Sequence, residues 1–539
     1  MTLPSSRPEP SWVDSGAAVI NGLDLLGLRL PVQHIGNSLI NGVTTITPLV
    51  RYLSFRAWII HVYVQARMPN RWKSFRESAS RAEAAIALGN MLVSPAAVNV
   101  IGADEAGDLV NSEADPLPLK ALVKQLAVNI YGNPFEQLGL KNPDKTEVPG
   151  LSTERGFPLA RQVHEQLTRC RLGQELAKGA PLDYAGRADL EEFGALVSVS
   201  DIPGAERDLL VSAILPERPL DRERPRLATY SALLFLADRL GRMPNEKDLF
   251  AAAVSPEGAL PEELHTVLDG WVKYCVRDLV AAAHEAVLRA VLEVLEDLRP
   301  ESGASVSAGE VIRDLVSRVD EHGEALSELG ILAPGESPLD LSFKQVFERV
   351  ERLTSDGLSE HHGLRGWQGR LNEVMTYSTA LSSDTGAAAV LPIAWALAAR
   401  RAEAGVSDGV EDFQSLSMQG WARVGLREVI IPSVQTFLRE NRSYGSVMAE
   451  LARRTVEQHL RISWTRMAAD PRRDVAVLTS DGERWSYRKA FYAGRTASRI
   501  YQAVGWLRQL GLIEEQGLTA DGRAALARTL DTLGREATR

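Results

Sequence analysis

The stretch from Pro261 to Arg299, PEELHTVLDGWVKYCVRDLVAAAHEAVLRAVLEVLEDLR, carries the clearest helical pattern in the chain. Apolar residues recur in it at steps of three and four, which is the period of a helix with one buried face. They are Leu264, Leu268, Trp271, Cys275, Leu279, Ala282, Ala286 and Ala290. Gly270 weakens the run by about 1 kcal/mol relative to alanine, which makes it a candidate break. We expect a long helix here that spans a domain or braces a partner.

The whole chain has the composition of a helical globular protein. Of its 539 residues, 45% are hydrophobic, 24% are charged and 6% are aromatic, and the formal net charge is -10. These fractions exclude a disordered, collagen-like or disulfide-stapled chain. Because strands favour aromatic and β-branched residues, the low aromatic fraction favours a mainly α fold. At roughly 150 residues per domain, the length predicts three or four domains.

A second buried helix is predicted in the N-terminal part. Thr47 and Pro48 fit a helix cap and a first helical position, and the run from there to Val64 is apolar on nearly all sides. Arg51 and Arg56 lie in this run and need partners, because a buried unpaired charge costs several kcal/mol. A structural salt bridge and a bound ligand phosphate are the two interpretations. An amphipathic helix over residues 71–91 follows.

The sequence also indicates whether the chain crosses a membrane and in which compartment it functions. Charged residues interrupt the run from Leu49 to Val64, which is shorter than the ~20 apolar residues of a membrane span. The first ten residues, MTLPSSRPEP, lack the apolar core of a secretory signal. The two cysteines, Cys170 and Cys275, are too far apart for a metal or redox motif and predict reduced core thiols. We expect a cytoplasmic protein without a membrane partner.

The clearest strand signals lie near the C-terminus. Residues 475–487 contain two short runs around a Ser480–Gly482 turn, which is typical of a hairpin. From residue 496 the chain reads TASRIYQAVGWLRQLGLIEEQGLTADGRAAL. Its apolar positions and glycines predict a helix that ends at Gly511, a strand over 512–513, a turn, a returning strand at Leu518 and a last helix from Thr519.

Within this segment, GWLRQLGLI (505–513) followed by LTADGR (518–523) resembles the end of the recognition helix and the wing of a winged-helix domain. The resemblance implies nucleic-acid binding, with the helix in a groove and the wing on the backbone. The binding residues that it implies are Arg495, Thr496, Ser498, Arg499, Gln502, Arg508 and Arg523. Between Asp481 and Arg528, eight basic residues outnumber five acidic ones, which supports this interpretation. The alternative is a winged helix that docks on protein only.

A second resemblance concerns residues 28–47, LRLPVQHIGNSLINGVTTIT, and 51–59, RYLSFRAWI. These segments are similar to the opening of uncharacterised bacterial proteins that are often encoded in phage-defence neighbourhoods. The shared features are a glycine turn, a threonine-rich step and an Arg-Tyr-x-x-Phe-x-x-Trp helix start. The resemblance implies no activity, but it implies an antiviral or DNA-transaction setting in a prokaryote.

Catalytic motifs are scarce in this sequence. It contains no phosphate-binding P-loop, dinucleotide fingerprint, HExxH helix or EF-hand loop, so we expect no cofactor and no metal. The single Gly-x-Ser-x-Gly pattern, at 405–409, follows a helical run where a nucleophile elbow needs a strand, which favours a surface turn. His361 and His362 are adjacent in a loop, where they form either a metal or acid–base pair or, more simply, a solvated turn.

Together these patterns predict a helical body with a C-terminal winged helix. The predicted domains are two helical ones over 1–145 and 146–300, a further helical one over 301–440, and a winged-helix-like one over 441–539. The expected function is a non-catalytic nucleic-acid-associated accessory or sensor subunit of a prokaryotic assembly, with double-stranded DNA and partner proteins as candidate ligands. Charge reversal at Arg495 and Arg499 should then abolish salt-sensitive DNA binding. The alternatives are a helical protein scaffold without DNA binding and a nuclease-type enzyme with a dispersed metal site.

Overall fold

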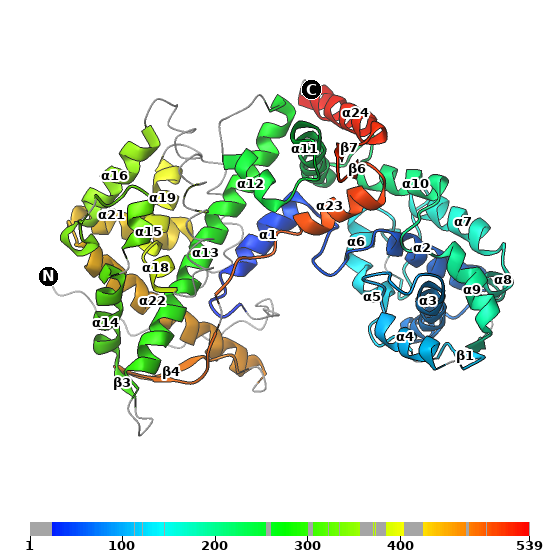
Figure 1. Ribbon diagram of the computed structural model, residues 1–539, viewed down its shortest axis with the longest axis horizontal. Coiled ribbons are helices and arrows are strands. Elements are labelled where there is room, and N and C mark those ends of the chain that lie inside the picture. Colours follow the sequence, from blue (N-terminus) through cyan, green and yellow to red (C-terminus); the bar gives the residue numbers. More distant parts are fainter. Residues whose placement is uncertain are drawn as a thin grey trace. The chain divides into compact units, whose positions relative to one another are not determined.

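In the computed structural model, helices make up most of the chain, which confirms the mainly α class (Figure 1). The structure describes residues 24–537 except 113, 121, 145, 180, 255–259, 300–304, 322, 334, 356–369, 371, 373–383, 404–423, 471–473 and 492. Its contacts divide it into two compact units. The first unit takes its described residues from Met1–Gln33 and Cys275–Thr496, and the second takes them from His34–Tyr274 and Ala497–Arg539.

Each unit therefore combines segments that are distant in the chain. The last of the predicted consecutive domains, 441–539, is divided between the two units at residue 496. Two helices contain a boundary between the units, α1 (Arg29–Leu39) and α13 (His265–Asp297). A linear sequence pattern contains no signal for such a division, because the division depends on contacts between remote segments.

The second unit is a helical body with two short strand pairs. Its elements are α2 (Arg51–Gln65), α3 (Trp72–Val93), α4 (Ala103–Asn111), β1 (Leu117–Pro118), α5 (Ala127–Ile130), α6 (Gly132–Gln137), α7 (Gly156–Leu167), α8 (Arg171–Ala177), β2 (Tyr184–Ala185), α9 (Arg187–Leu196), α10 (Gly204–Ile214), η1 (Asp221–Glu223), α11 (Arg224–Leu240), α12 (Glu246–Val254), η2 (Glu262–Leu264), α23 (Ile500–Gln509), β6 (Ile513–Glu514), β7 (Gly517–Leu518) and α24 (Ala520–Ala537). The strand pairs β1–β2 and β6–β7 are antiparallel.

Helix α2 is the central helix that the N-terminal pattern predicts. Every residue from Arg51 to Tyr63 is buried, as expected for a helix that is apolar on nearly all sides. The predicted start at Thr47 and Pro48 is wrong, because the helix begins at Arg51. The Thr47 hydroxyl instead accepts a hydrogen bond from the Thr44 amide (3.1 Å), which closes a turn ahead of the helix.

Two close contacts with neighbouring helices explain glycines inside helices. The Gly89 and Gly194 backbones meet where α3 crosses α9, and a β-carbon on Gly194 would lie 2.3 Å from the Gly89 oxygen. Gly270 lies inside α13, and a β-carbon there would lie 2.4 Å from Leu39 Cδ2 on α1. The expected break at Gly270 does not occur. The missing side chain makes room for a neighbouring helix, which offsets the weak helix propensity of glycine.

The first unit places helices beside a small sheet. Its elements are β3 (Val306–Ser307), α14 (Ala308–Glu321), α15 (Glu324–Glu328), η3 (Pro338–Asp340), α16 (Phe343–Ser355), α18 (Asp384–Ala388), α19 (Leu391–Glu403), η5 (Leu426–Ile430), α21 (Ile431–Arg439), α22 (Tyr444–Ala469), β4 (Leu478–Asp481) and β5 (Arg484–Tyr487). The strand order is β3-β5-β4, and both pairings are antiparallel. The predicted hairpin is therefore confirmed as β4–β5.

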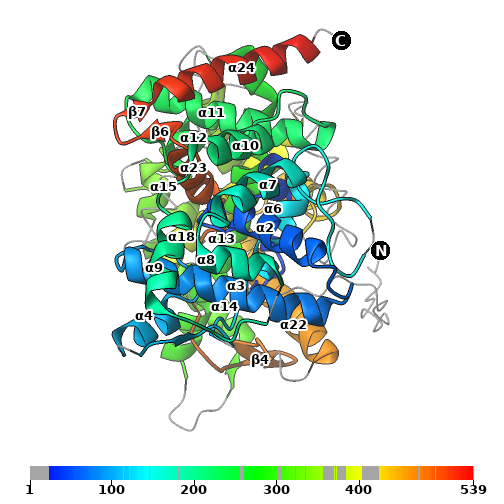
Figure 2. The same cartoon turned by 90° about the vertical axis from the view of Figure 1, so that its right-hand side faces the viewer.

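The C-terminal elements also follow the sequence pattern. Helix α23, the pair β6–β7 and helix α24 occur in the predicted order, and Gly511 has the positive φ of +67° expected of a helix stop. Within the second unit, α24 lies along α11, and β7 also contacts α11 (Figures 1 and 2). The winged-helix identity of this segment stays a prediction.

Candidate functional site

The C-terminal helix α23 binds the 43–50 segment, which links α1 to α2, through one face. Arg499, immediately before α23, donates hydrogen bonds to the Asn37 side chain and to the Val43 carbonyl, the latter at 3.1 Å. One turn later, Gln502 Nε2 donates to the Thr45 carbonyl at 3.0 Å. Two of the residues predicted to face nucleic acid therefore face the chain itself.

The same face continues along the helix. Trp506 Nε1 donates to the Thr47 carbonyl at 2.8 Å, and Gln509 Nε2 donates to the Pro48 carbonyl at 2.8 Å. Gln509 Oε1 also accepts the Val50 amide at 2.9 Å. The spacing of three, four and three residues from Arg499 places all four side chains on one side of a helix. We call Arg499, Gln502, Trp506 and Gln509 the inner face of α23.

The inner face has a clear physical role. The 43–50 segment has little regular structure, so its polar backbone groups need partners from elsewhere in the chain. Four side chains of α23 supply these partners, and the Tyr131 hydroxyl supplies another by accepting the Leu49 amide at 3.0 Å. The contacts therefore pair the amides just ahead of α2 and hold the entry to the central helix.

Three further predicted residues are also turned inward. In the first unit, Arg495 binds the buried Asp278 carboxylate, which also accepts the Thr496 amide at 2.9 Å. In the second unit, Ser498 donates to Glu246 Oε2 at 2.5 Å. Thr496 and Ser498 are themselves buried. These contacts leave Thr496 and Ser498 without the exposure that a groove contact requires.

Arg508 and Arg523 are the predicted residues that face solvent. Their side chains are 58% and 64% exposed. Arg508 lies 3.4 Å from Glu515, and Arg523 lies 3.4 Å from Asp238. Exposed pairs of this kind contribute at most about 1 kcal/mol, so both guanidinium groups remain accessible to a ligand.

The outer face of α23 consists of Tyr501, Gly505 and Arg508. Tyr501 is 80% exposed, and the 43–50 segment exposes Ile46 at 59%. The sequence interpretation did not single out Tyr501. The available signal was its position outside the buried Ile500–Val504–Leu507 stripe, where an aromatic side chain gains nothing from the core.

The two arginines of α2 differ in their surroundings. Arg51 forms a two-pronged ion pair with Glu206 (3.1 and 3.0 Å), so its salt-bridge interpretation is confirmed. Arg56 lies over the Phe135 ring, 5.3 Å from its centroid. Among the described residues, neither Nε nor Nη1 of Arg56 has a hydrogen-bond partner. Burial lowers the pKa of Arg56 to about 10, and attraction to Glu83 opposes that shift.

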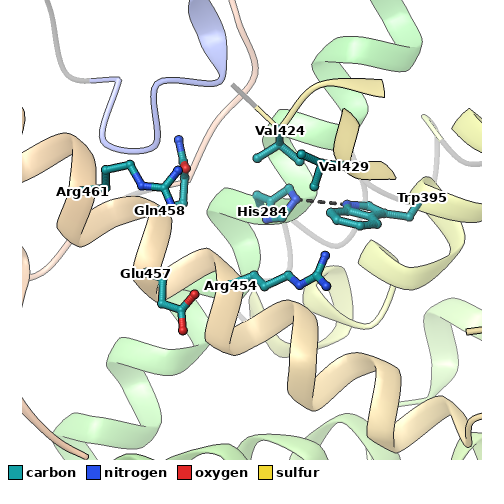
Figure 3. A pocket seen from close by; sticks show the side chains of 8 residues that line it. All are labelled: His284, Trp395, Val424, Val429, Arg454, Glu457, Gln458 and Arg461. Atoms are coloured by element: carbon teal, nitrogen blue, oxygen red, sulfur yellow. Dashed lines mark hydrogen bonds between the residues drawn. The ribbon is translucent and has the colours of Figure 1, made fainter. Parts of the chain in front are cut away.

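A pocket of about 160 Å³ lies in the first unit among α13, α19, η5 and α22 (Figure 3). At its base, Trp395 Nε1 donates to His284 Nε2 at 3.1 Å. Thr455 donates its hydroxyl proton to the Leu451 carbonyl, so its oxygen accepts from His284 Nδ1 at 2.7 Å. His284 is therefore neutral, and both of its nitrogens are engaged. Burial first, and then the charges of Arg277 and Arg454, lower its pKa to about 3.

His361, His362 and the 405–409 pattern lie outside the described residues. In the part of the chain that the structure describes, no group of three or more His, Cys, Asp or Glu side chains is arranged to hold a metal ion. Among the described helices, none has the length and apolar character needed to cross a membrane.

Comparisons of this chain with protein-family models, with curated proteins and with solved structures found no match.

Proposed function

We propose that this protein is a helical scaffold that binds other proteins, and that the outer face of α23 is one of its docking surfaces. The observation that carries the proposal is the use of the inner face. Arg499 and Gln502, which the nucleic-acid hypothesis needs in a groove, instead bind the 43–50 segment. Helix α23 is thereby fixed as part of the second unit, and a third side of the helix, next to the inner face and apart from the buried Ile500–Val504–Leu507 stripe, is exposed at Tyr501 and Arg508.

Charge also supports a protein partner. A protein that binds nucleic acid needs basic side chains facing the phosphates. Here Arg508 and Arg523 each lie beside a carboxylate, and the β6–β7 hairpin exposes Glu514 and Glu515. These carboxylates would repel a phosphate backbone. The whole chain has a net charge of -10, which adds to that repulsion.

The outer face has the composition of a protein-binding patch. Exposed tyrosine and arginine side chains are enriched where truncation costs most binding energy. Tyr501 and Arg508 lie seven residues apart on α23, hence on one side of it, and Gly505 between them leaves space for a partner side chain. A tyrosine that is 80% exposed and touches little of its own protein is free to fill a partner's pocket.

The test is capture of a stoichiometric partner from the native source with the tagged full chain at about 0.5 M salt, where phosphate contacts are weak. Tyr501→Asp should reduce partner recovery about tenfold or more, as expected for a central aromatic contact. Tyr184→Asp is the matched control, because Tyr184 is 60% exposed in the same unit. Equal recovery with Tyr501→Asp and Tyr184→Asp would contradict the proposal.

Association with double-stranded DNA is the second candidate function. The exposure of Arg508 and Arg523 favours it, together with the local excess of basic residues in the C-terminal segment. Under this alternative the protein is an accessory or sensor subunit of a cytoplasmic antiviral assembly in a prokaryote, and its winged helix makes only backbone contacts.

A further inference from the structure

The pocket of the first unit has the size of a small organic ligand. Its volume of about 160 Å³ is close to the roughly 150 Å³ of an engineered cavity that binds benzene. Its walls combine two chemistries. Trp395, Val424 and Val429 form an apolar side, whereas Arg454 and Arg461 belong to the polar side (Figure 3).

The two arginines occupy equivalent positions on one helix. Arg454 and Arg461 are seven residues apart on α22, so both side chains project from the same side of the helix. Arg454 is held in place by the Ser433 hydroxyl at 2.7 Å and by Glu450. Its guanidinium group lies 5.9 Å from the Trp395 ring centroid. A fixed guanidinium group beside an apolar wall is preorganised for a planar anion.

The charges around the pocket favour an anion. Glu450 is shared between Arg454 and Arg442, so these three groups carry one net positive charge. Burial first, and then the charges of Arg277 and Arg454, disfavour the charged form of His284, which also lines the pocket. The Glu457 carboxylate also borders the pocket, but it points away from His284 and Trp395 (Figure 3).

We propose that this pocket binds a small organic acid, in which a carboxylate meets the arginines of α22 and a ring or branched apolar group meets Trp395 and the two valines. The planar carboxylate matches the fork of a guanidinium group. The apolar side distinguishes such a ligand from an inorganic anion, which would leave the Trp395–Val429 wall uncovered. His284 takes no part in proton transfer, because both of its nitrogens are engaged.

The test uses benzoate as the probe on the full chain, with binding measured by calorimetric titration and by the thermal midpoint. Benzamide and inorganic phosphate are the comparison ligands. We expect benzoate to bind saturably and to raise the midpoint. Benzamide, which has the same shape without the charge, and phosphate, which lacks the ring, should do neither. Absence of benzoate binding, or equal responses to benzoate and either comparison ligand, would overturn the proposal.

Variants of α22 locate the site. Arg461→Gln should weaken benzoate binding by about tenfold or more, since a charge-assisted hydrogen bond is lost. Arg461→Lys keeps the charge and should recover much of the affinity. Arg453→Gln is the control, because Arg453 is also exposed on α22 but does not line the pocket. If Arg461→Gln binds benzoate as tightly as Arg453→Gln does, the pocket is not the binding site.

Discussion

Arg51 and Arg56 lie five residues apart on α2, yet their buried guanidinium groups are stabilised in different ways. Arg51 is 1% exposed and bonds to Glu206 and to the carbonyls of Leu196, Ser198 and Asp201. Arg56 lies over the Phe135 ring and is attracted by the buried Glu83 carboxylate. The sequence predicted that both would need partners. It contained no signal that would distinguish them, because the partners come from other helices.

This contrast predicts unequal responses to substitution. Arg51→Met should lower the free energy of unfolding by about 3–5 kcal/mol, because Glu206 would remain buried and uncompensated. Arg56→Met should cost less than about 1.5 kcal/mol, because it removes a desolvated charge and leaves an apolar chain over Phe135, while the buried Glu83 keeps its hydrogen bonds from the Ala127 and Val128 amides. Urea denaturation of the two variants measures both values. A larger loss in Arg56→Met than in Arg51→Met would contradict this assignment.

His284 predicts a dependence of stability on pH. Its pKa is lowered to about 3 in the folded protein, below the ordinary value of 6.5. A depressed folded pKa contributes stability that is fully present above pH 6.5 and is lost as the pH falls toward 3. His284→Gln should therefore show a weaker decline of the urea midpoint across that window. The exposed His265 provides the control variant, His265→Gln, whose curve should run parallel to that of the unaltered protein.

At the scale of elements, α23 secures the entry to α2. Gln509 makes two of these contacts, because its side chain accepts the Val50 amide and also donates to the Pro48 carbonyl. Gln509→Ala should lower the free energy of unfolding by about 1–3 kcal/mol, since two partly buried backbone groups lose their partner. Hydrogen exchange of the 43–50 amides should accelerate. Arg508→Ala, on the outer face, should change neither quantity. Equal effects of the two variants would contradict the assigned role of the inner face of α23.

Much of the element inventory could be predicted from local pattern. Periodicity and glycine positions sufficed for α13, for α23 through α24 and for the β4–β5 hairpin, because these signals act over a few residues. The orientation of α23 could not be predicted. Its inner side is set by the 43–50 segment, more than four hundred residues upstream, and amphipathicity alone does not say which polar side chains bind backbone carbonyls. The pocket could not be predicted either, because its walls come from four elements that are separated in the sequence.

At the scale of the whole molecule, the C-terminal segment completes a unit that begins with residue 34. The chain therefore uses its last forty-odd residues to stabilise its N-terminal helices, which explains why a segment that resembles a DNA-reading module is largely committed to internal contacts. Of the residues predicted to contact nucleic acid, Arg508 on the outer face of α23 and Arg523 remain exposed. This arrangement carries the proposal of a protein-binding scaffold.

Fluorescence anisotropy of a labelled duplex of about 30 base pairs, titrated with the full chain at about 50 and 200 mM salt, tests this account most directly. The charge-reversed variant Arg508→Glu/Arg523→Glu is titrated alongside, because both side chains are exposed and their reversal leaves the inner face intact. The account predicts no saturable binding by either protein at micromolar concentrations. Saturable binding that weakens with salt and disappears in the variant would contradict it and would make nucleic acid the ligand of the C-terminal segment.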